Sequence, residues 1–464
     1  MTAALRRLSQ GLLAAFAIAA LVLGYWGIVR GDELLARADN PRRILAERRI
    51  RRGQILDRHG TPLAESHIDP ETGFVSRHYP YPDAAATVGY SSLRYGVSGI
   101  EAAYDSLLRG EPSPGTLDAL LLSLLHRPQS GGDVRLTIDL AVQQAADRAL
   151  GDHAGAVVVL TVPQGEVLAL SSRPTFDANF LDENWENLRA DPRAPLINRA
   201  TQGLYQPGTI LQSVILGAAL DLHVVDRGEI WMGMLSVDVD SGLLRCAGAV
   251  EGNDLQGVYA AACPAPFQEI ARRVGAARLD AVLADFGLLE TPPFVLPTSA
   301  ADLNQPPAQS DLLLTAVGQG NLTVSPLQMA LVAAAFADHG RMPALRLVQA
   351  VRPPNGTWQP VAPAGYPRGT ISRDSADAIA EMMSFAVREG AAQAAAIEGV
   401  DVYGHSGLAL AGPQQTYNAW FIGFVRRNSE EAVATAVLIE GSDNAALAAQ
   451  IGGEVLHAAL TASP

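Results

Sequence analysis

The first strong hydrophobic pattern is an uncharged run from Leu8 to Val29, which lies between Arg7 and Arg30. As a helix this run is about 33 Å long, enough to cross the hydrocarbon layer of a membrane. Tyr25 and Trp26 lie where amphipathic rings favour the membrane surface. A cleavable signal peptide is the alternative, but no clear small-residue cleavage site follows. We therefore predict a transmembrane anchor over residues 8–29.

Arginines lie on both sides of this run, so they give no clear orientation for the predicted helix in the membrane. Arg6 and Arg7 precede it, and a larger group follows it closely: Arg37, Arg42, Arg43, Arg48 and Arg49. Because arginine is enriched on the cytoplasmic side, the count alone would keep the bulk of the chain inside. The rule weakens before a large translocated domain, so charge does not decide the orientation.

Residues 30–132 form a polar segment in which short β-type runs alternate with turns. Arg58, His59 and Gly60 have the composition of a hairpin turn, in which glycine supplies a positive φ. Turn-forming residues gather again at 112–115 and 129–132. We therefore expect a small β-rich domain that ends near Asp133.

Residues 133–464 show two kinds of periodicity. A strand leading into a helix is predicted over 134–150, followed by a hairpin over 155–172 that turns at Pro163 to Gly165. Helical spacing predicts four further helices, and two apolar runs near the C-terminus predict adjacent strands: helices Ile210 to Leu220, Phe267 to Phe286, Pro326 to His339 and Ser375 to Glu389, and strands 418–425 and 430–440. Strands at both ends with helices between them predict a mixed α/β domain whose terminal strands share one sheet.

The basic residues exclude a whole class of mechanisms. All 34 residues in the Lys+Arg total are arginine, so the chain has no lysine. Arginine does not lose its proton near neutral pH, whereas a desolvated lysine can act as a base or an amine nucleophile. A general drift of the composition towards arginine explains this bias as well as a functional cause does. The chemical consequence is the same in both cases. A net charge of -14 also speaks against a nucleic-acid partner.

Cys246 and Cys263 are the two cysteines of the chain. They are too few for a disulfide scaffold and lack the spacing of a metal site. A disulfide between them and two separate buried thiols both remain open. We expect no metal and no cofactor.

Six segments, in order along the chain, resemble the class B penicillin-binding proteins, which are peptidoglycan D,D-transpeptidases. They are RRGQILDRHGTPLA, GVSGIEAAYDSLLRG, GAVVVLTVPQGEVLAL, RPTFDANF, INRATQGLYQPGT and GQGNLTVSPLQMA. The resemblance implies a cytoplasmic N-terminus at 1–7, the anchor, a non-catalytic pedestal domain at 30–132, and a transpeptidase-like domain at 133–464. That last domain is expected to be an antiparallel sheet flanked by helices, of the penicillin-binding protein and β-lactamase type. The bulk of the chain is then expected outside the cytoplasm.

The family's S-x-x-K motif places a serine nucleophile and a lysine one helical turn apart. The matching segment has Thr209 at the serine position and Gln212 at the lysine position. A neutral amide cannot take the proton, and losing one member of such a pair typically costs several powers of ten in rate. Ser213 does not replace the motif, because it lies about 100° around the helix.

The other two family motifs are altered as well. Ala262 and Pro264 occupy the positions of the serine and asparagine of S-x-N, so hydroxyl and amide are both missing, and a proline-capped helix start suits the segment best. His405, Ser406 and Gly407 occupy the positions of K-T-G. Since histidine can carry charge or donate a hydrogen bond, this is the mildest change.

Three functions remain open from the sequence. The first is an inactive relative that acts as a scaffold or regulator of cell-wall machinery, with a polytopic glycosyltransferase as the implied partner of the anchor and pedestal. The second is an altered acyl transferase or hydrolase that uses Thr209 with His405. The third is a non-covalent receptor for a β-lactam or for the stem peptide of peptidoglycan. We favour the first, because the structural segments remain while the catalytic groups are gone.

Overall fold

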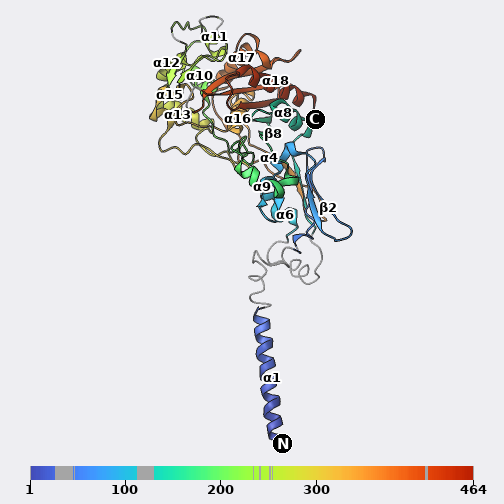
Figure 1. Cartoon of the computed structure of the whole chain (residues 1–464). Coiled ribbons are helices and arrows are strands. Elements are labelled where there is room, and N and C mark those ends of the chain that lie inside the picture. Colours follow the sequence, from blue (N-terminus) through green and yellow to red (C-terminus); the bar gives the residue numbers. More distant parts are fainter. Residues whose placement is uncertain are drawn as a thin grey trace.

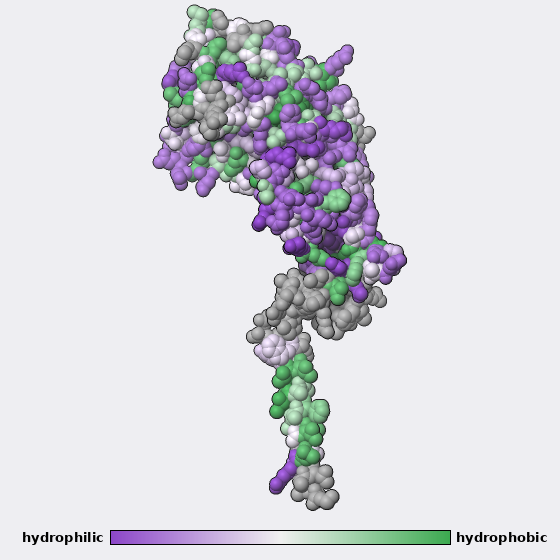
Figure 2. All heavy atoms as spheres, in the orientation of Figure 1, coloured by the Kyte–Doolittle hydropathy of each residue, from purple (hydrophilic) through white to green (hydrophobic). Residues whose placement is uncertain are grey.

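The computed structural model describes residues 2–26, 45, 47–111, 130–233, 235–239, 242–249, 252, 254–412 and 416–462 of the 464-residue chain. Helix α1, Thr2–Gly24, stands apart from the rest of the protein (Figure 1), and apolar side chains cover most of it beyond the arginines near its N-terminal end (Figure 2). The section Arg6–Gly24 is long and apolar enough to cross a membrane and is not buried by other residues. It agrees with the predicted anchor, of which residues 27–29 lie outside the described residues.

A six-stranded sheet forms the centre of the pedestal, between α1 and the larger domain in Figure 1. Its strand order is β13 (Gln359–Pro360), β12 (Val348–Arg352), β6 (Asp133–Leu136), β1 (Ile55–Leu56), β2 (Pro62–Ile68) and β3 (Val75–His78). The predicted turn joins β1 to β2, with Gly60 at a φ of +92°. Strands from both sides of residue 133 thus contribute to this sheet.

Short elements complete the pedestal. They are β4 (Ser91–Ser92), β5 (Gly96–Val97), η2 (Pro82–Ala84), α4 (Ala85–Val88), α5 (Gly99–Ala103) and α6 (Asp105–Arg109). Glu101 on α5 is fully buried and forms ion pairs with Arg52 at 2.7 Å and with Arg77 at 2.6 Å. A buried carboxylate is stable only when it is paired in this way, so these arginines fix α5 onto the sheet.

The larger domain is built on a five-stranded antiparallel sheet. Its strand order is β15 (Val402–Leu410), β16 (Tyr417–Arg426), β17 (Ala432–Ile439), β7 (Gly155–Val162) and β8 (Val167–Arg173). Three predictions are confirmed: the hairpin of β7 and β8, the adjacent strands β16 and β17, and one sheet shared by strands from both ends of the domain. Since helices cover both faces, these strands are continuous apolar runs rather than alternating ones.

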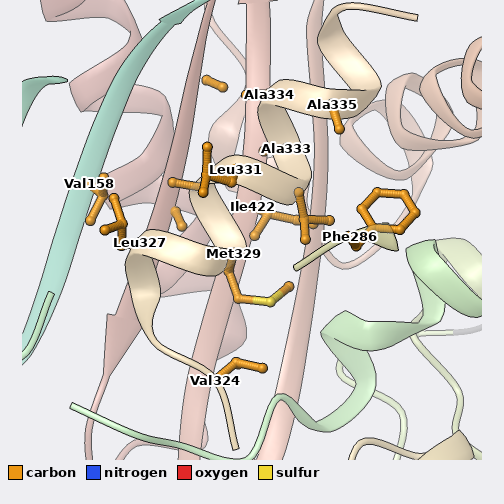
Figure 3. Packing of buried hydrophobic residues seen from close by; sticks show 14 of the residues in the cluster. Val158, Phe286, Val324, Leu327, Met329, Leu331, Ala333, Ala334, Ala335 and Ile422 are labelled. Atoms are coloured by element: carbon orange, nitrogen blue, oxygen red, sulfur yellow. The ribbon is translucent and has the colours of Figure 1, made fainter. Parts of the chain in front are cut away.

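Helix α16, Pro326–Ala337, forms the core on one face of this sheet (Figure 3), and every one of its residues is buried. It begins with a capping box in which Ser325 and Gln328 bond to one another's backbone amides. Leu327 and Met329 lie among the buried side chains drawn in Figure 3. On the other face, α8 (Leu140–Leu150) and α18 (Ala445–Thr461) pack against each other and on the sheet.

Further helices and short strands form a lobe beside the sheet and the connections to it. They are α9 (Leu181–Ala190), α10 (Gln212–Asp221), α11 (Leu255–Ala260), α12 (Ala265–Val274), α13 (Ala276–Asp285), α14 (Pro307–Ser310), α15 (Leu312–Ala316), α17 (Arg373–Glu389), η3 (Ala178–Phe180), η4 (Gly208–Leu211), η5 (Gln393–Ala395), β9 (Val237–Val239), β10 (Gly242–Leu244), β11 (Arg341–Met342) and β14 (Arg368–Gly369). The single helix predicted over Phe267 to Phe286 is wrong. Gly275 adopts a φ of +81° and ends α12, so the chain forms two helices there.

Candidate active site

Thr209 lies in η4, at the start of the helical segment that continues as α10. Gly208 precedes it with a φ of +58°, and a Cβ atom at this glycine would lie 2.1 Å from the carbonyl oxygen of Leu408. Only glycine therefore allows η4 to approach strand β15 so closely. The hydroxyl Oγ1 of Thr209 accepts a hydrogen bond from the backbone N–H of Leu408 at 3.0 Å. The hydroxyl group is thus held against the edge strand.

Gln212, the first residue of α10, is fully buried. Its Nε2 donates to the carbonyl oxygen of Cys263 at 2.9 Å, and its Oε1 has no partner within the described part of the chain. The amide therefore connects α10 to the segment that precedes α12. It performs a structural task at a position where the family resemblance implies a proton acceptor.

Ala262 and Pro264 flank this contact at the turn between α11 and α12. Ala262 is buried and has a φ of +53°, while Pro264 is the N-cap of α12. The structure thus has the proline-capped helix start that the sequence favoured. Cys263 between them forms a disulfide with Cys246, one of the two alternatives that the sequence left open.

His405 lies on β15 and is fully buried. Its ring stacks on that of Tyr259, with the centroids 4.2 Å apart and the planes 7° apart. Its Nε2 lies 3.4 Å from the backbone carbonyl oxygen of Thr209, and that oxygen can only accept, so Nε2 carries the proton. Burial lowers the pKa of His405 to about 3, against the smaller opposing effect of this hydrogen bond. The imidazole is therefore neutral at pH 7.

Tyr259 is a site residue that sequence reasoning missed. Besides stacking on His405, its hydroxyl lies 2.9 Å from Oγ of Ser213, and burial raises its pKa. No spacing rule connects Tyr259 on α11 with β15, because the two elements are brought together only by the tertiary fold. Ser213, which the sequence set aside as a nucleophile, serves here as the partner of this phenol.

Ser406 and Gly407 complete the segment of β15 beside Thr209. The hydroxyl of Ser406 is buried and has no partner among the described residues. A Cβ atom at Gly407 would lie 2.6 Å from the backbone nitrogen of Ile210 and 2.8 Å from Oγ1 of Thr209. The glycine therefore permits the same close approach as Gly208 on the facing segment.

A hairpin of β9 and β10 lies beside β15, which is the edge strand of the large sheet. Leu244 on β10 is fully buried, and the hydroxyl of Tyr417 donates to the carbonyl oxygen of Leu243. Arg245 forms an ion pair with Asp443 at 2.7 Å. The hairpin is thus fastened to the sheet, and none of the side chains of Thr209, Gln212 or His405 is accessible to solvent.

The structure brings the residues predicted from all three altered motifs into one buried cluster. It joins His405 to the backbone of Thr209 rather than to its hydroxyl, so the pair required for a threonine and histidine mechanism is not formed. Within the described ranges, no group of three or more His, Cys, Asp or Glu residues could hold a metal ion.

Comparison with known proteins identifies both domains. Residues 155–459 match the family model of the penicillin-binding protein transpeptidase domain, and residues 52–134 match that of the penicillin-binding protein A dimerisation domain. The chain is 31% identical to the peptidoglycan D,D-transpeptidase PbpA of Mycolicibacterium smegmatis, over 99% of both chains. It is 30% identical to PbpA of Mycobacterium tuberculosis over the full length of both.

Solved structures give the same result. The crystal structure of PBPA from M. tuberculosis aligns with a TM-score of 0.78 at 29% identity, covering 89% of this chain and 99% of that one. The ceftriaxone acyl-enzyme complex of the same M. tuberculosis protein aligns with a TM-score of 0.80 at 29% identity, covering 90% and 100%. The shared fold, order of domains and length of the match show that the chain belongs to the penicillin-binding protein transpeptidase family.

Proposed function

We propose that this protein is a non-catalytic member of its family that acts by contact within the cell-wall synthesis machinery. The observation that carries the proposal is the position of Gln212. Its amide is buried and hydrogen-bonded to Cys263, in a chain that has no lysine to replace it. A buried amide cannot accept the proton that a hydroxyl nucleophile must lose.

The remaining groups do not supply a base. The proton on Nε2 of His405 points to the backbone oxygen of Thr209, and its other nitrogen, Nδ1, has no partner in the described structure. A pKa of about 3 makes the imidazole a weak base at neutral pH. Thr209 itself accepts the backbone N–H of Leu408, which holds its oxygen against β15. These contacts favour inertness over an altered acyl transferase.

A non-covalent receptor for β-lactams or stem peptides has less support. Such ligands carry a carboxylate, which a cation would stabilise, and the imidazole at the K-T-G position is neutral. Hairpin β9–β10 also lies beside the edge strand to which an extended peptide would have to add. Both features favour a contact role over a binding groove.

The proposed location is the outer side of the cytoplasmic membrane, with α1 as the anchor and residues 1–7 in the cytoplasm. The disulfide between Cys246 and Cys263 supports it, because such bonds persist in oxidising compartments. The proposed partner is a polytopic glycosyltransferase or another cell-wall synthesis protein, which would contact α1 and the pedestal.

A fluorescent penicillin tests this proposal. The full chain is incubated with the reagent, denatured in detergent, and examined for retained label, with M. tuberculosis PBPA, for which a penicillin G acyl-enzyme complex is known, as the positive control. We expect no retained label and no bound reagent before denaturation. Label that survives denaturation would overturn inertness, and its loss in Thr209→Ala would identify the nucleophile. Label present only before denaturation would instead support the receptor.

A further inference from the structure

A cavity of about 640 Å³ lies where the pedestal meets the larger domain. One wall comes from α4 and α5 of the pedestal, and the other from residues 172–176, 195–202 and 294–297 of the transpeptidase domain. Asn198 joins the two walls, because its Nδ2 donates to the carbonyl oxygen of Ala86 at 2.9 Å. The cavity belongs to neither domain alone, and junctions of this kind are common positions for ligand sites.

The lining of this cavity is uncharged. In a chain in which 18% of residues are charged, no Asp, Glu, Arg or His is among the described residues that line it. A cavity without a counter-charge disfavours ionic ligands, because such a ligand would lose its hydration without compensation. The same argument excludes the carboxylate ligands of the family's catalytic groove.

Aromatic and aliphatic side chains form most of the wall. Tyr90 makes an edge contact with Phe176, with ring centroids 6.1 Å apart, and a second one with Trp185 at 6.2 Å. These contacts hold the rings in place on one side of the cavity, while Ile197 is 48% exposed beside it. The cavity is therefore largely formed before any ligand binds.

Thr201 is one of the polar residues that line the cavity, with Ser98, Thr175 and Gln202 among the others. Its side chain is fully buried and its Oγ1 has no hydrogen-bond partner in the described part of the protein. The backbone of Thr201 is already bonded to Asn198 at 3.3 Å and to Ser299 at 3.0 Å, so the residue is held firmly. A buried hydroxyl without a partner is costly, and an acceptor on a ligand would remove that cost.

We propose that this cavity binds an uncharged, mainly apolar molecule that carries a hydrogen-bond acceptor, and that Thr201 recognises this acceptor. Its volume falls in the range of about 300 to 1,000 Å³ that is usual for drug-sized ligands. Because both domains contribute walls, the bound ligand stabilises one arrangement of the pedestal relative to the larger domain. This inference is independent of whether the buried cluster around Gln212 is inert.

Benzophenone is a suitable probe, since it is uncharged, has two apolar rings and carries one carbonyl acceptor. On illumination its ketone takes a hydrogen atom from a nearby C–H group, and the two carbon radicals join, so the ketone becomes a tertiary alcohol bonded to the protein. The full chain is reconstituted in lipid nanodiscs, illuminated with benzophenone and analysed by peptide mass spectrometry. We expect adducts in the peptides that contain residues 85–103, 172–202 and 294–297.

Matched variants make the experiment specific. Ala102 is exposed at the cavity, so Ala102→Trp can fill the space without disturbing the core and should abolish these adducts. The same substitution at Ala364, in a separate cavity of about 260 Å³, should leave them unchanged. Thr201→Val removes one neutral hydrogen bond. It should therefore raise the benzophenone concentration needed for half-maximal labelling about fivefold.

Three results would overturn the proposal. Adducts spread over the surface without enrichment at the cavity would exclude a site there. Equal labelling of the parent protein and Ala102→Trp would place the probe elsewhere. Equal labelling by the anionic analogue 4-benzoylbenzoate would show that the cavity does not select uncharged ligands.

Discussion

At the scale of single residues, Gln212 is the position where the structural role is clearest. Its Nε2 bonds to the backbone of Cys263, and both groups are buried. Gln212→Met keeps a similar volume but leaves that carbonyl without its donor, so we expect a loss of about 1 to 3 kcal/mol in the free energy of unfolding. Urea denaturation, monitored by tryptophan fluorescence, measures this loss.

A control for this substitution exists on the surface. Gln450 lies exposed on α18, where it bonds to Glu454, and Gln450→Met should change the free energy of unfolding by less than about 0.5 kcal/mol. Equal stability of the two variants would mean that the buried amide at position 212 contributes nothing.

His405 predicts a pH dependence of stability. Burial lowers its pKa from 6.5 to about 3. Between these two pH values the unfolded chain therefore binds a proton at this residue that the folded chain does not bind. The free energy of unfolding should therefore fall as the pH drops from 6.5 towards 3, by up to about 1.4 kcal/mol per pH unit. Denaturation of the native protein and of His405→Gln at a series of pH values separates this contribution, because the variant should show a weaker slope.

The matched control is His457→Gln on α18, where the histidine is exposed. This variant should keep the slope of the native protein. If His405→Gln also kept it, the imidazole would not be the group that titrates.

Single residues also mark the limit of sequence reasoning at this site. Thr209, Gln212 and His405 were identified from their places in motifs, which are local patterns. Tyr259 was not, because its stacking on His405 depends on a helix and a strand that lie far apart in the chain. Motifs thus located the altered groups but not the side chain that packs against them.

Among the elements, we expect hairpin β9–β10 to depend on the nearby disulfide for its stability. Cys246 follows β10 closely, and its disulfide fixes the chain to Cys263 beside the site. A bond closing a loop of this size contributes on the order of 3 kcal/mol. Replacing both cysteines by alanine should therefore speed hydrogen exchange in residues 237–239 and 242–249, as measured by mass spectrometry.

Strands β16 and β17 serve as the internal control in the same experiment. They lie in the middle of the large sheet and are almost wholly buried, so their exchange should remain slow. Unchanged exchange in the hairpin would mean that Tyr417 and the ion pair of Arg245 hold it without the disulfide.

The helices and strands also show where the periodic pattern of apolar residues predicts an element correctly and where it does not. Long apolar runs predicted β7, β8, β16, β17 and α16 correctly, because their burial leaves a strong pattern. Gly275 broke one expected helix in two, since helical spacing continues across a residue whose φ is positive. Strands β1, β11 and β14 are two residues long, too short to leave any periodic signal.

For the whole molecule, the order of segments carried more information than any one of them. The apolar run at 8–29 predicted an anchor, six family-like segments predicted a pedestal and a larger domain, and the comparisons confirmed the family over almost the entire chain. Pairing between distant segments was not predictable. Strand β12, which follows α16 in sequence, joins β6 in the pedestal sheet, and no local pattern announces such a partner.

Orientation in the membrane is the remaining prediction, and it belongs to the whole molecule. Arginines after α1 outnumber Arg6 and Arg7, whereas the disulfide favours an oxidising compartment for the large domain. We expect alkaline phosphatase, which needs disulfides to fold, to be active when fused after Pro464, and β-galactosidase to be inactive there. Replacing Arg6 and Arg7 by glutamate should lower the phosphatase signal, because the substitution removes the positive charge that holds the N-terminus in the cytoplasm. Active β-galactosidase in the native fusion would place the domain in the cytoplasm, where the pairing of Cys246 with Cys263 would lose its physical basis.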